Sequence, residues 1–195
     1  KGWEKNIGIE NDTVNIIHLN ETIREEHKEF FNELNDKMML KLYNSNNIKD
    51  ITTMVIVNID NISQPALVKT SIFETTKNGN LISIISRVLF NSNFSTGKKI
   101  TQYGVFGIED GKFDFEMNHD LTCKNAISYQ NILLLESLEK TNDLSKIALE
   151  LNLTKEMVEK RLSTLLNNFE LKEIDELVDF AKSEKILPNQ FTNYI

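Results

Sequence analysis

The sequence predicts an α+β domain with an antiparallel sheet over residues 1–116, followed by an all-α domain of four helices over residues 127–195. Three observations support this division. Apolar residues recur at helical spacing early in the chain, β-branched runs follow, and helical spacing returns near residue 127. A helix followed by a series of strands is typical of α+β folds. Residues 117–126 are expected to be a short linker.

The first predicted element is a helix over Thr22–Tyr43, whose apolar residues share one face. Thr22 and Glu25 have the spacing of a capping box, which favours a helix start at this point. The acidic residues of the opposite face are interpreted as a solvated surface. The inward set is Ile23, His27, Phe30, Phe31, Leu34 and Met38, and the acidic set is Glu25, Glu26, Glu29 and Glu33.

Beyond residue 50 the pattern changes to runs rich in β-branched residues, which favour strands. Asn78-Gly79 between two of these runs is a strong hairpin signal. Successive strands joined by turns predict an antiparallel meander. The expected strands are Thr52–Ile59, Leu67–Thr75, Leu81–Phe90 and Lys99–Ile108, with Lys112–Glu116 as one further candidate.

Asp143–Leu171 has the pattern of a helix-turn-helix. Ala148 is small where a second helix must cross closely, Asn152-Leu153 forms the break with Leu153 expected to be buried, and Thr154 is a good N-cap. The second helix should bury Met157, Val158, Leu162 and Leu165, as the first buries Ile147, Ala148 and Leu151.

This arrangement leaves Glu159, Lys160, Ser163 and Thr164 pointing outward on the helix that such folds place in the DNA major groove. The spacing fits equally a helical hairpin that only packs within the protein. From the spacing alone, both interpretations stay open.

Ile127–Leu187 as a whole resembles the LuxR/GerE-type DNA-binding domain. ISYQNILLLESLEK is similar to its first helix, DLSKIALELNL to its second, TKEMVEKRLSTLLNNFEL to its recognition helix and ELVDFAKSEKIL to its closing helix. The resemblance implies a dimer, with Leu177, Phe180 and Ala181 as the contact candidates, although the same residues could equally pack within the monomer. The DNA-binding residues that it implies are Lys155, Glu159, Lys160, Arg161, Ser163, Thr164 and Lys172.

The same segment departs from the family pattern in its charges. Glu159 stands where the family usually has a basic residue, and Ile174 replaces a phosphate-binding arginine. Gln130, Asn131 and Leu133 replace the family's charged opening. Residues 127–195 contain eight Lys and Arg against twelve Asp and Glu, which gives a net charge of −4. Because phosphate contacts supply most non-specific DNA affinity, these departures put active DNA binding in doubt.

Residues 2–108 resemble the later part of a PAS-type sensor domain of the kind that precedes LuxR-type modules. LVKTSIFETTKNGNLISIISRVLF is similar to its long hairpin and KKITQYGVFGI to its final strand, with Gly2-Trp3 and Ile16–Leu19 at the start. A small apolar ligand is implied, although the same side chains would also serve as core against the first helix. The expected lining is Ile72, Ile82, Ile84, Val88, Phe90, Val105 and Phe106.

Composition limits the function classes. The 195 residues carry a net charge of −7, which disfavours general coating of nucleic acids or anionic membranes. No run of 18 apolar residues predicts a membrane span. Cys123 is the only cysteine and no signal peptide is visible, so a cytoplasmic protein is expected. The first residue is not Met, and the opening strands of the PAS-like domain are expected upstream of this chain.

No motif points to an enzyme or a cofactor. Gly-rich phosphate loops are absent, and no serine or cysteine stands in a recognisable nucleophile motif. His119, Asp120 and Cys123 lie close in sequence, but structural zinc normally needs four Cys or His ligands. His27 is expected to be a hydrogen-bonded core histidine, and His18 a local turn cap.

The sequence therefore predicts a bacterial transcriptional regulator that binds DNA through its helix-turn-helix under the control of the PAS-like domain, as a homodimer without a cofactor. The main alternative is a protein-interaction module with a degenerate helix-turn-helix. A third interpretation, an enzyme with an unrecognised site, would require a deep pocket that holds an acid, base or nucleophile with a perturbed pKa.

Overall fold

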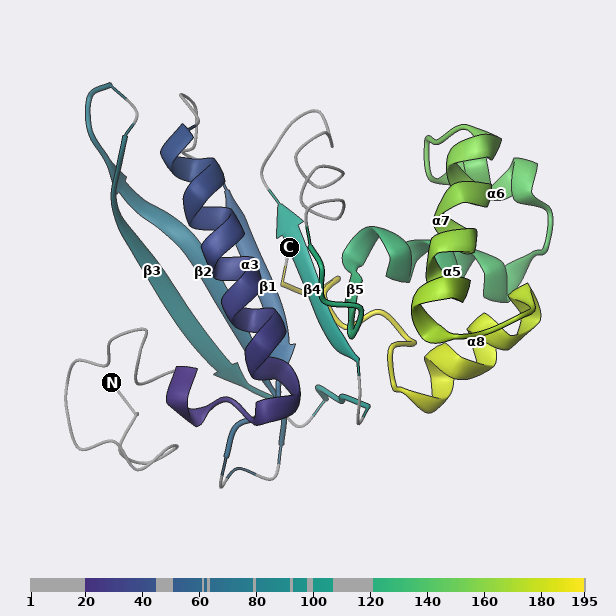
Figure 1. Cartoon of the computed structure of the whole chain (residues 1–195), viewed down its shortest axis with the longest axis horizontal. Coiled ribbons are helices and arrows are strands. Elements are labelled where there is room, and N and C mark those ends of the chain that lie inside the picture. The colour runs from purple at the N-terminus through teal and green to yellow at the C-terminus, as the bar shows by residue number, and fades with distance from the viewer. Residues whose placement is uncertain are drawn as a thin grey trace.

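The protein is a mixed five-stranded sheet with a long helix on one face and a module of shorter helices against its edge and its other face (Figure 1). The structure is a computed structural model. It describes residues 20–44, 51–60, 62, 64–78, 80–91, 93–97, 100–106 and 121–194. The predictions for Gly2-Trp3, Ile16–Leu19, Gly79 and Lys112–Glu116 lie outside these residues.

The long helix α3 spans Glu25–Asn44, and every residue of its predicted inward face is buried. The predicted capping box is wrong. Ile23 forms an isolated bridge with Ile59, and the Arg24 amide donates to the Asn58 carbonyl, so the chain is extended just before the helix. Thr22 is therefore tied to the sheet side of the molecule, where its carbonyl accepts from the Asp60 amide.

The sheet has the order β3-β2-β1-β4-β5. Its long hairpin agrees with the prediction, but the simple meander does not, because β4 pairs with β1 and not with β3. β1 has an almost continuous apolar run that is buried on both faces, which suits a central strand. The bounds are Thr52–Val57 for β1, Ala66–Thr75 for β2, Leu81–Phe90 for β3, Thr101–Phe106 for β4 and Ala126–Ser128 for β5.

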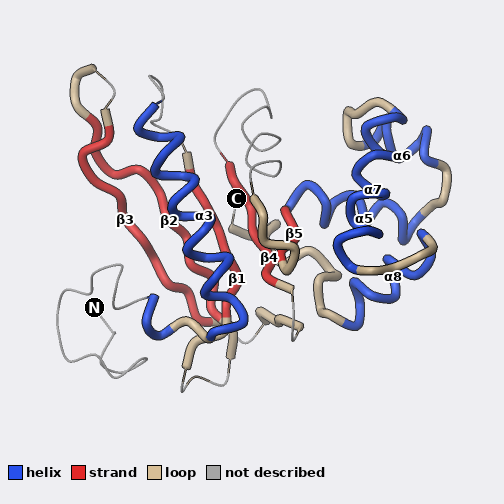
Figure 2. The backbone as a smooth tube through the Cα atoms, in the orientation of Figure 1, coloured by secondary structure: helices blue, strands red, loops and turns tan. Residues whose placement is uncertain are grey.

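Alternation along the strands gives the sheet two apolar faces. Val55, Val57 and Val68 pack with α3, which Figure 2 shows lying along the sheet. Met54 and Leu67 point to the opposite face and belong to one cluster with the helical module. The sheet is therefore a shared wall between two cores.

The helical module begins with a strand and not, as predicted, with a helix. β5 pairs parallel with β4, so Ile127 and Ser128 belong to the sheet and make it mixed. The rest of the predicted helical region is confirmed as four helices. They are α5 (Tyr129–Lys140), α6 (Leu144–Glu150), α7 (Lys155–Phe169) and α8 (Ile174–Ser183).

Local capping explains the break between α6 and α7. The Leu153 amide donates to the Ala148 carbonyl at 2.8 Å, and Asn152 takes a positive φ of 54°. Asn adopts this left-handed conformation more readily than most residues. The Thr154 hydroxyl accepts from the Met157 amide, which confirms the predicted N-cap. The predicted burial is too strong at three positions, since Leu151 and Leu153 are half-buried and Met157 is 38% exposed.

The closing helix α8 packs inside the single chain. Leu177 and Ala181 are fully buried, and the Phe180 ring stacks on Phe169 with 4.8 Å between centroids. Leu177 and Ala181 are therefore core and not available for a dimer contact, whereas Phe180 is only half-buried and its predicted contact stays a prediction. Their spacing fits both roles, and only the packing of α5 and α7 around α8 decides between them.

A segment after α8 fastens the module to the sheet. The Gln102 amide of β4, with its side chain fully buried, donates to the Lys185 carbonyl at 3.0 Å. The Gln190 amide nitrogen donates to the Ser95 carbonyl at 2.8 Å, while its oxygen accepts from the Ser95 amide at 2.6 Å. A Cβ on Gly97 would collide with the backbone that follows α8, so glycine is required for this close approach.

A second tie joins α3 to the chain just before β5. The Glu33 carboxylate accepts from the Thr122 amide and hydroxyl and from the Cys123 amide, at 2.6–2.9 Å. Partial burial opposes ionisation, but these hydrogen bonds, aided by Lys37, keep the pKa of Glu33 below its usual value. Glu33 is therefore a structural acceptor, and its interpretation as a purely solvated residue is wrong.

Gln102→Ala should lower the free energy of unfolding by about 1–3 kcal/mol, because it removes a fully buried amide that donates to the Ser95 and Lys185 carbonyls and accepts from the Gln190 amide. Urea unfolding measures the change. Gln130→Ala is the matched control, since that side chain is only half-buried and makes no hydrogen bond among the described residues; it should cost less than about 0.5 kcal/mol. Equal effects for the two variants would contradict the assigned role of Gln102.

Candidate functional site

The exposed surface of α7 consists of two stripes with different surroundings. Lys155, Glu159 and Ser163 follow one another at four-residue spacing and are exposed. Lys155 Nζ lies 3.7 Å from Glu159 Oε1 in an ion pair between half-exposed side chains. Exposed pairs of this kind contribute little to stability. This outer stripe is open to a partner.

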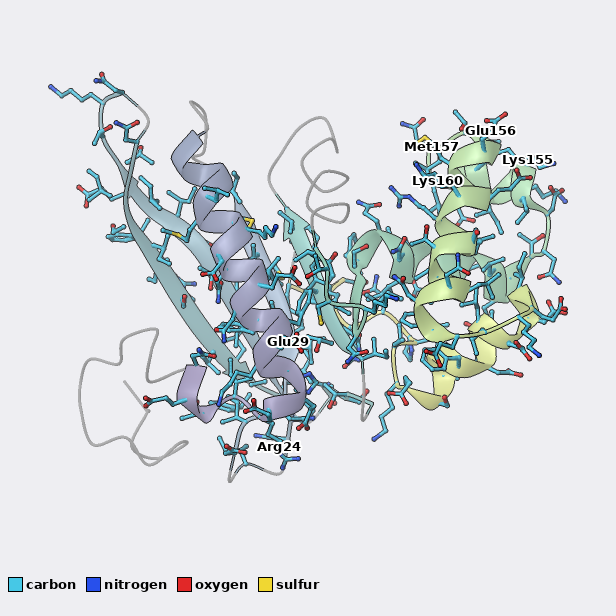
Figure 3. All side chains as sticks on the ribbon, in the orientation of Figure 1. Arg24, Glu29, Lys155, Glu156, Met157 and Lys160 are labelled. Atoms are coloured by element: carbon cyan, nitrogen blue, oxygen red, sulfur yellow. The ribbon has the colours of Figure 1, made fainter. Side chains whose placement is uncertain are left out.

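The second stripe faces the sheet. It lines a cleft of about 190 Å³ between α7 and the edge of the sheet. In Figure 3, Met157 and Lys160 lie on the side of α7 nearer the sheet, whereas Lys155 lies on the other side. The outward surface predicted from spacing is therefore divided between two directions. The stripe consists of Met157, Lys160, Arg161, Thr164 and Asn168.

The predicted DNA-binding residues are thus only partly brought together. Lys160, Arg161 and Thr164 share the cleft, while Lys155, Glu159 and Ser163 form the outer stripe. Lys172 lies before α8, where its backbone amide donates to Glu176 Oε2 at 2.9 Å. That bond belongs to the capping of α8.

The opposite wall of the cleft comes from α3, β4, β5 and the start of α5. Phe30 and Tyr103 contribute aromatic rings, and Ser128 and Asn131 contribute polar groups. Cys123 is half-buried there, and burial, with the nearby charges of Glu29 and Glu33, raises the pKa of its thiol. The thiol is therefore protonated at neutral pH. Sequence reasoning missed this cleft, because its walls are far apart in the chain.

A separate pocket of about 330 Å³ lies between α3 and the sheet. It contains only two of the predicted lining residues, Ile72 and Ile84. Val88, Phe90 and Val105 pack in the core beneath α3, and Phe106 packs with the helical module. Ile82 is 54% exposed. The remaining walls include Phe31, Met38 and Met39 of α3 and Thr53 and Thr70 of the sheet.

His27 is a buried core residue, as predicted. The Asn58 amide lies 3.1 Å from its Nε2, and Thr101 Oγ1 lies 2.8 Å from its Nδ1. Asn58 Oδ1 accepts from the Thr96 hydroxyl, so the amide nitrogen donates to Nε2 and the ring proton is on Nδ1. Burial lowers the pKa of His27, with Glu26 opposing the shift and Arg24 adding to it. The ring is therefore neutral at neutral pH.

The described residues offer little support for metal binding or nucleophilic catalysis. Among them, no three His, Cys, Asp or Glu side chains gather in a way that would hold a metal ion. His18, His119 and Asp120 lie outside the described residues. Ser71 and Ser86 are engaged by cross-strand threonines at 2.9 Å. No described helix is both long and apolar enough to cross a membrane.

Comparisons with known proteins give limited similarity. No protein-family model matches the chain, and no curated protein matches it. A phage VqmA–DPO complex overlays with a TM-score of 0.32 and 13% identity, over 86% of this chain and 67% of the other. A Vibrio cholera VqmA–ligand–DNA complex gives a TM-score of 0.27 and 13% identity. The chain spans 61% of that second structure, and the match covers 80% of this chain.

The buried His27 should make stability depend on pH. Its pKa is lowered in the folded state, so below the ordinary value of 6.5 the unfolded chain binds the proton more readily. The free energy of unfolding should therefore fall as pH drops from 7.5 to 5.5. Urea unfolding of wild type and His27→Gln measures this, and the variant should show a smaller loss. An identical loss in both proteins would exclude His27 as the cause.

Proposed function

We propose that the protein is a bacterial, cytoplasmic transcriptional regulator that binds DNA through α7. The observation that carries this proposal is the capped α6–turn–α7 unit, whose second helix leaves an exposed polar stripe beside its buried face. A helix presented in this way has the geometry that reads the major groove in helix-turn-helix proteins. The resemblance to LuxR-type domains, seen in the sequence, agrees with this assignment.

The proposed division is a PAS-like domain over residues 1–116, a linker at 117–126 and a LuxR-type domain at 127–195. The α+β part would control α7, because one stripe of that helix faces the sheet. The cleft is far smaller than a DNA duplex, whose major groove alone is about 12 Å wide. Full engagement of Lys160 and Thr164 with DNA would require the helical module to move away from the sheet. The proposed DNA-binding residues are Lys155, Glu159, Lys160, Arg161, Ser163, Thr164 and Lys172.

A second candidate is a protein-interaction module without DNA binding. The acidic balance of residues 127–195, with a net charge of −4, favours it, because DNA repels an acidic surface. The Lys155–Glu159 ion pair also neutralises a cation at the start of the outer stripe. The two candidates differ in one measurable property, which is saturable binding to DNA.

Lys160→Ala should weaken specific DNA binding by about 1–3 kcal/mol, the usual range for a good base contact. Glu159→Lys should raise non-specific affinity, because it replaces a charge that repels phosphate and releases Lys155 from its ion pair. Both side chains are exposed, so neither change should lower stability by more than about 0.5 kcal/mol. Affinity titrations with genomic fragments at two salt concentrations measure the effects.

Lys182→Ala is the matched control for these titrations. Lys182 lies on α8, where it pairs with Glu139 at 2.8 Å, away from the proposed reading helix. Its loss should leave DNA affinity close to that of wild type. If wild type and all three variants fail to bind DNA, or all bind alike, α7 is not a reading helix and the interaction module replaces the regulator.

We also propose a homodimer. Its interface is the β2–β3 hairpin and not α8. This hairpin exposes large apolar side chains at the open edge of the sheet, an arrangement that favours a partner surface. Ile85 and Leu89 follow the strand alternation onto the side of the sheet opposite α3. The exposed set is Phe73, Ile82, Ile84, Ile85 and Leu89.

Ile85→Lys should convert the dimer to a monomer, because it places a charge in an apolar contact. Sedimentation velocity over a range of protein concentrations measures the change. Glu74→Lys, an exposed substitution on the neighbouring strand, should leave the dimer intact. A wild-type chain that stays monomeric at high concentration would exclude this interface.

A further inference from the structure

The cleft between α7 and the sheet has the composition of a small-molecule site. Its floor is aromatic, since the buried rings of Phe30 and Tyr103 lie 4.8 Å apart at a tilt of 47°. Leu165 and Ala126 add apolar surface from the two sides. Sites for small ligands are typically concave and mostly apolar, with a few polar groups that fix the ligand's orientation. We propose that this cleft binds a small aromatic carboxylate.

Lys160 and Asn131 determine the charge and polarity of the ligand. The Lys160 ammonium makes no ion pair with any described residue. The Asn131 side chain makes no hydrogen bond with any described residue. A cation and an amide donor that line one cleft suit the two oxygens of a carboxylate, and hydrogen bonds to charged groups are the stronger ones. The Thr164 hydroxyl is already engaged by the Lys160 carbonyl at 2.9 Å.

Neither Cys123 of the cleft wall nor Glu33, which binds the segment that contains Cys123, competes with the ligand for Lys160. The Cys123 thiol is protonated, because burial raises its pKa, so it offers no competing negative charge. The Glu33 carboxylate is held by three hydrogen bonds from Thr122 and Cys123. An incoming carboxylate would therefore be the anion that meets the Lys160 ammonium.

The volume limits the occupant to a small molecule. About 190 Å³ corresponds to roughly six waters at about 30 Å³ each. This is enough for one ring system that bears a carboxylate. A peptide helix, about 10 Å across with its side chains, is too wide for the cleft.

Binding at this site would also regulate the proposed function, and this part of the inference rests on that function. Lys160 and Thr164 belong both to the cleft and to the proposed DNA-reading surface. A ligand held between α7 and the sheet favours the position in which these side chains face inward. Ligand and DNA should then weaken each other's binding by the same factor, because coupling between two sites is reciprocal.

Calorimetric titration of the full chain with 2-naphthoate tests the site directly, with 2-naphthamide as the uncharged counterpart. Wild type should bind the carboxylate more tightly than the amide. Lys160→Gln should weaken naphthoate binding about tenfold or more, the effect of removing a charge-assisted hydrogen bond, and leave naphthamide binding unchanged. Lys155→Gln, on the same helix but outside the cleft, should behave as wild type.

Two tryptophan substitutions, one that fills the cleft and one that fills the pocket between α3 and the sheet, locate the bound probe. Thr164→Trp, at an exposed position of the cleft wall, should abolish binding of both compounds. Ile84→Trp, in the pocket between α3 and the sheet, should leave both unchanged. The reverse result would place the probe in that pocket and overturn the proposal. Equal affinity of wild type for the two compounds, or no binding of naphthoate, would also overturn it. Urea unfolding of each variant verifies that it is folded.

DNA titrations with and without saturating naphthoate separate this inference from the proposed function. Naphthoate should lower the DNA affinity of wild type, whereas naphthamide, which binds the cleft more weakly, should lower it less at the same concentration. A chain that binds naphthoate in the cleft but never binds DNA would refute the regulator and support the ligand site. A chain that binds DNA equally with and without bound naphthoate would refute the coupling.

Discussion

Two glutamine amides, of the buried Gln102 and the half-buried Gln190, connect the two parts of this protein. Gln102 of β4 and Gln190 of the last segment share the carbonyl groups of Ser95 and Lys185 and contact each other at 3.3 Å. Because unpaired buried polar groups are costly, this network specifies one position of the last segment over the sheet. Phe191 is then fully buried in the cluster that α5, α7 and α8 share with the sheet.

The position of α7 follows from this attachment. Its buried face, built from Val158, Leu162 and Leu165, joins the module core, and its two polar stripes are left with different neighbours. One stripe is open, and the other meets the sheet edge across the cleft. A helix that resembles a DNA-reading element is therefore only partly available, and motion of the module relative to the sheet would change what it can contact.

The sheet links the two cores mechanically. Its α3 side contains the apolar cluster around Phe30 together with the neutral His27, whose bonds reach Thr101 of β4 and Asn58 after β1. Its other side carries Met54, Ile56 and Leu67 in the core of the module. β1 is buried on both faces and pairs on both edges. A change in the packing of either core therefore acts on the same strands.

Local patterns in the sequence determined the individual elements. The inward stripe of α3, the bounds of β3, the Thr154 cap and the helical spacing of α5–α8 each depend on residues within a few positions of one another. Tertiary structure alone decided the rest. The pairing of β4 with β1, the parallel strand β5, the exposure of Met157 and the inward direction of Lys160 depend on contacts between distant segments. The attachment of the module is equally non-local, since Gln102 and Gln190 are 88 positions apart and no periodicity relates them.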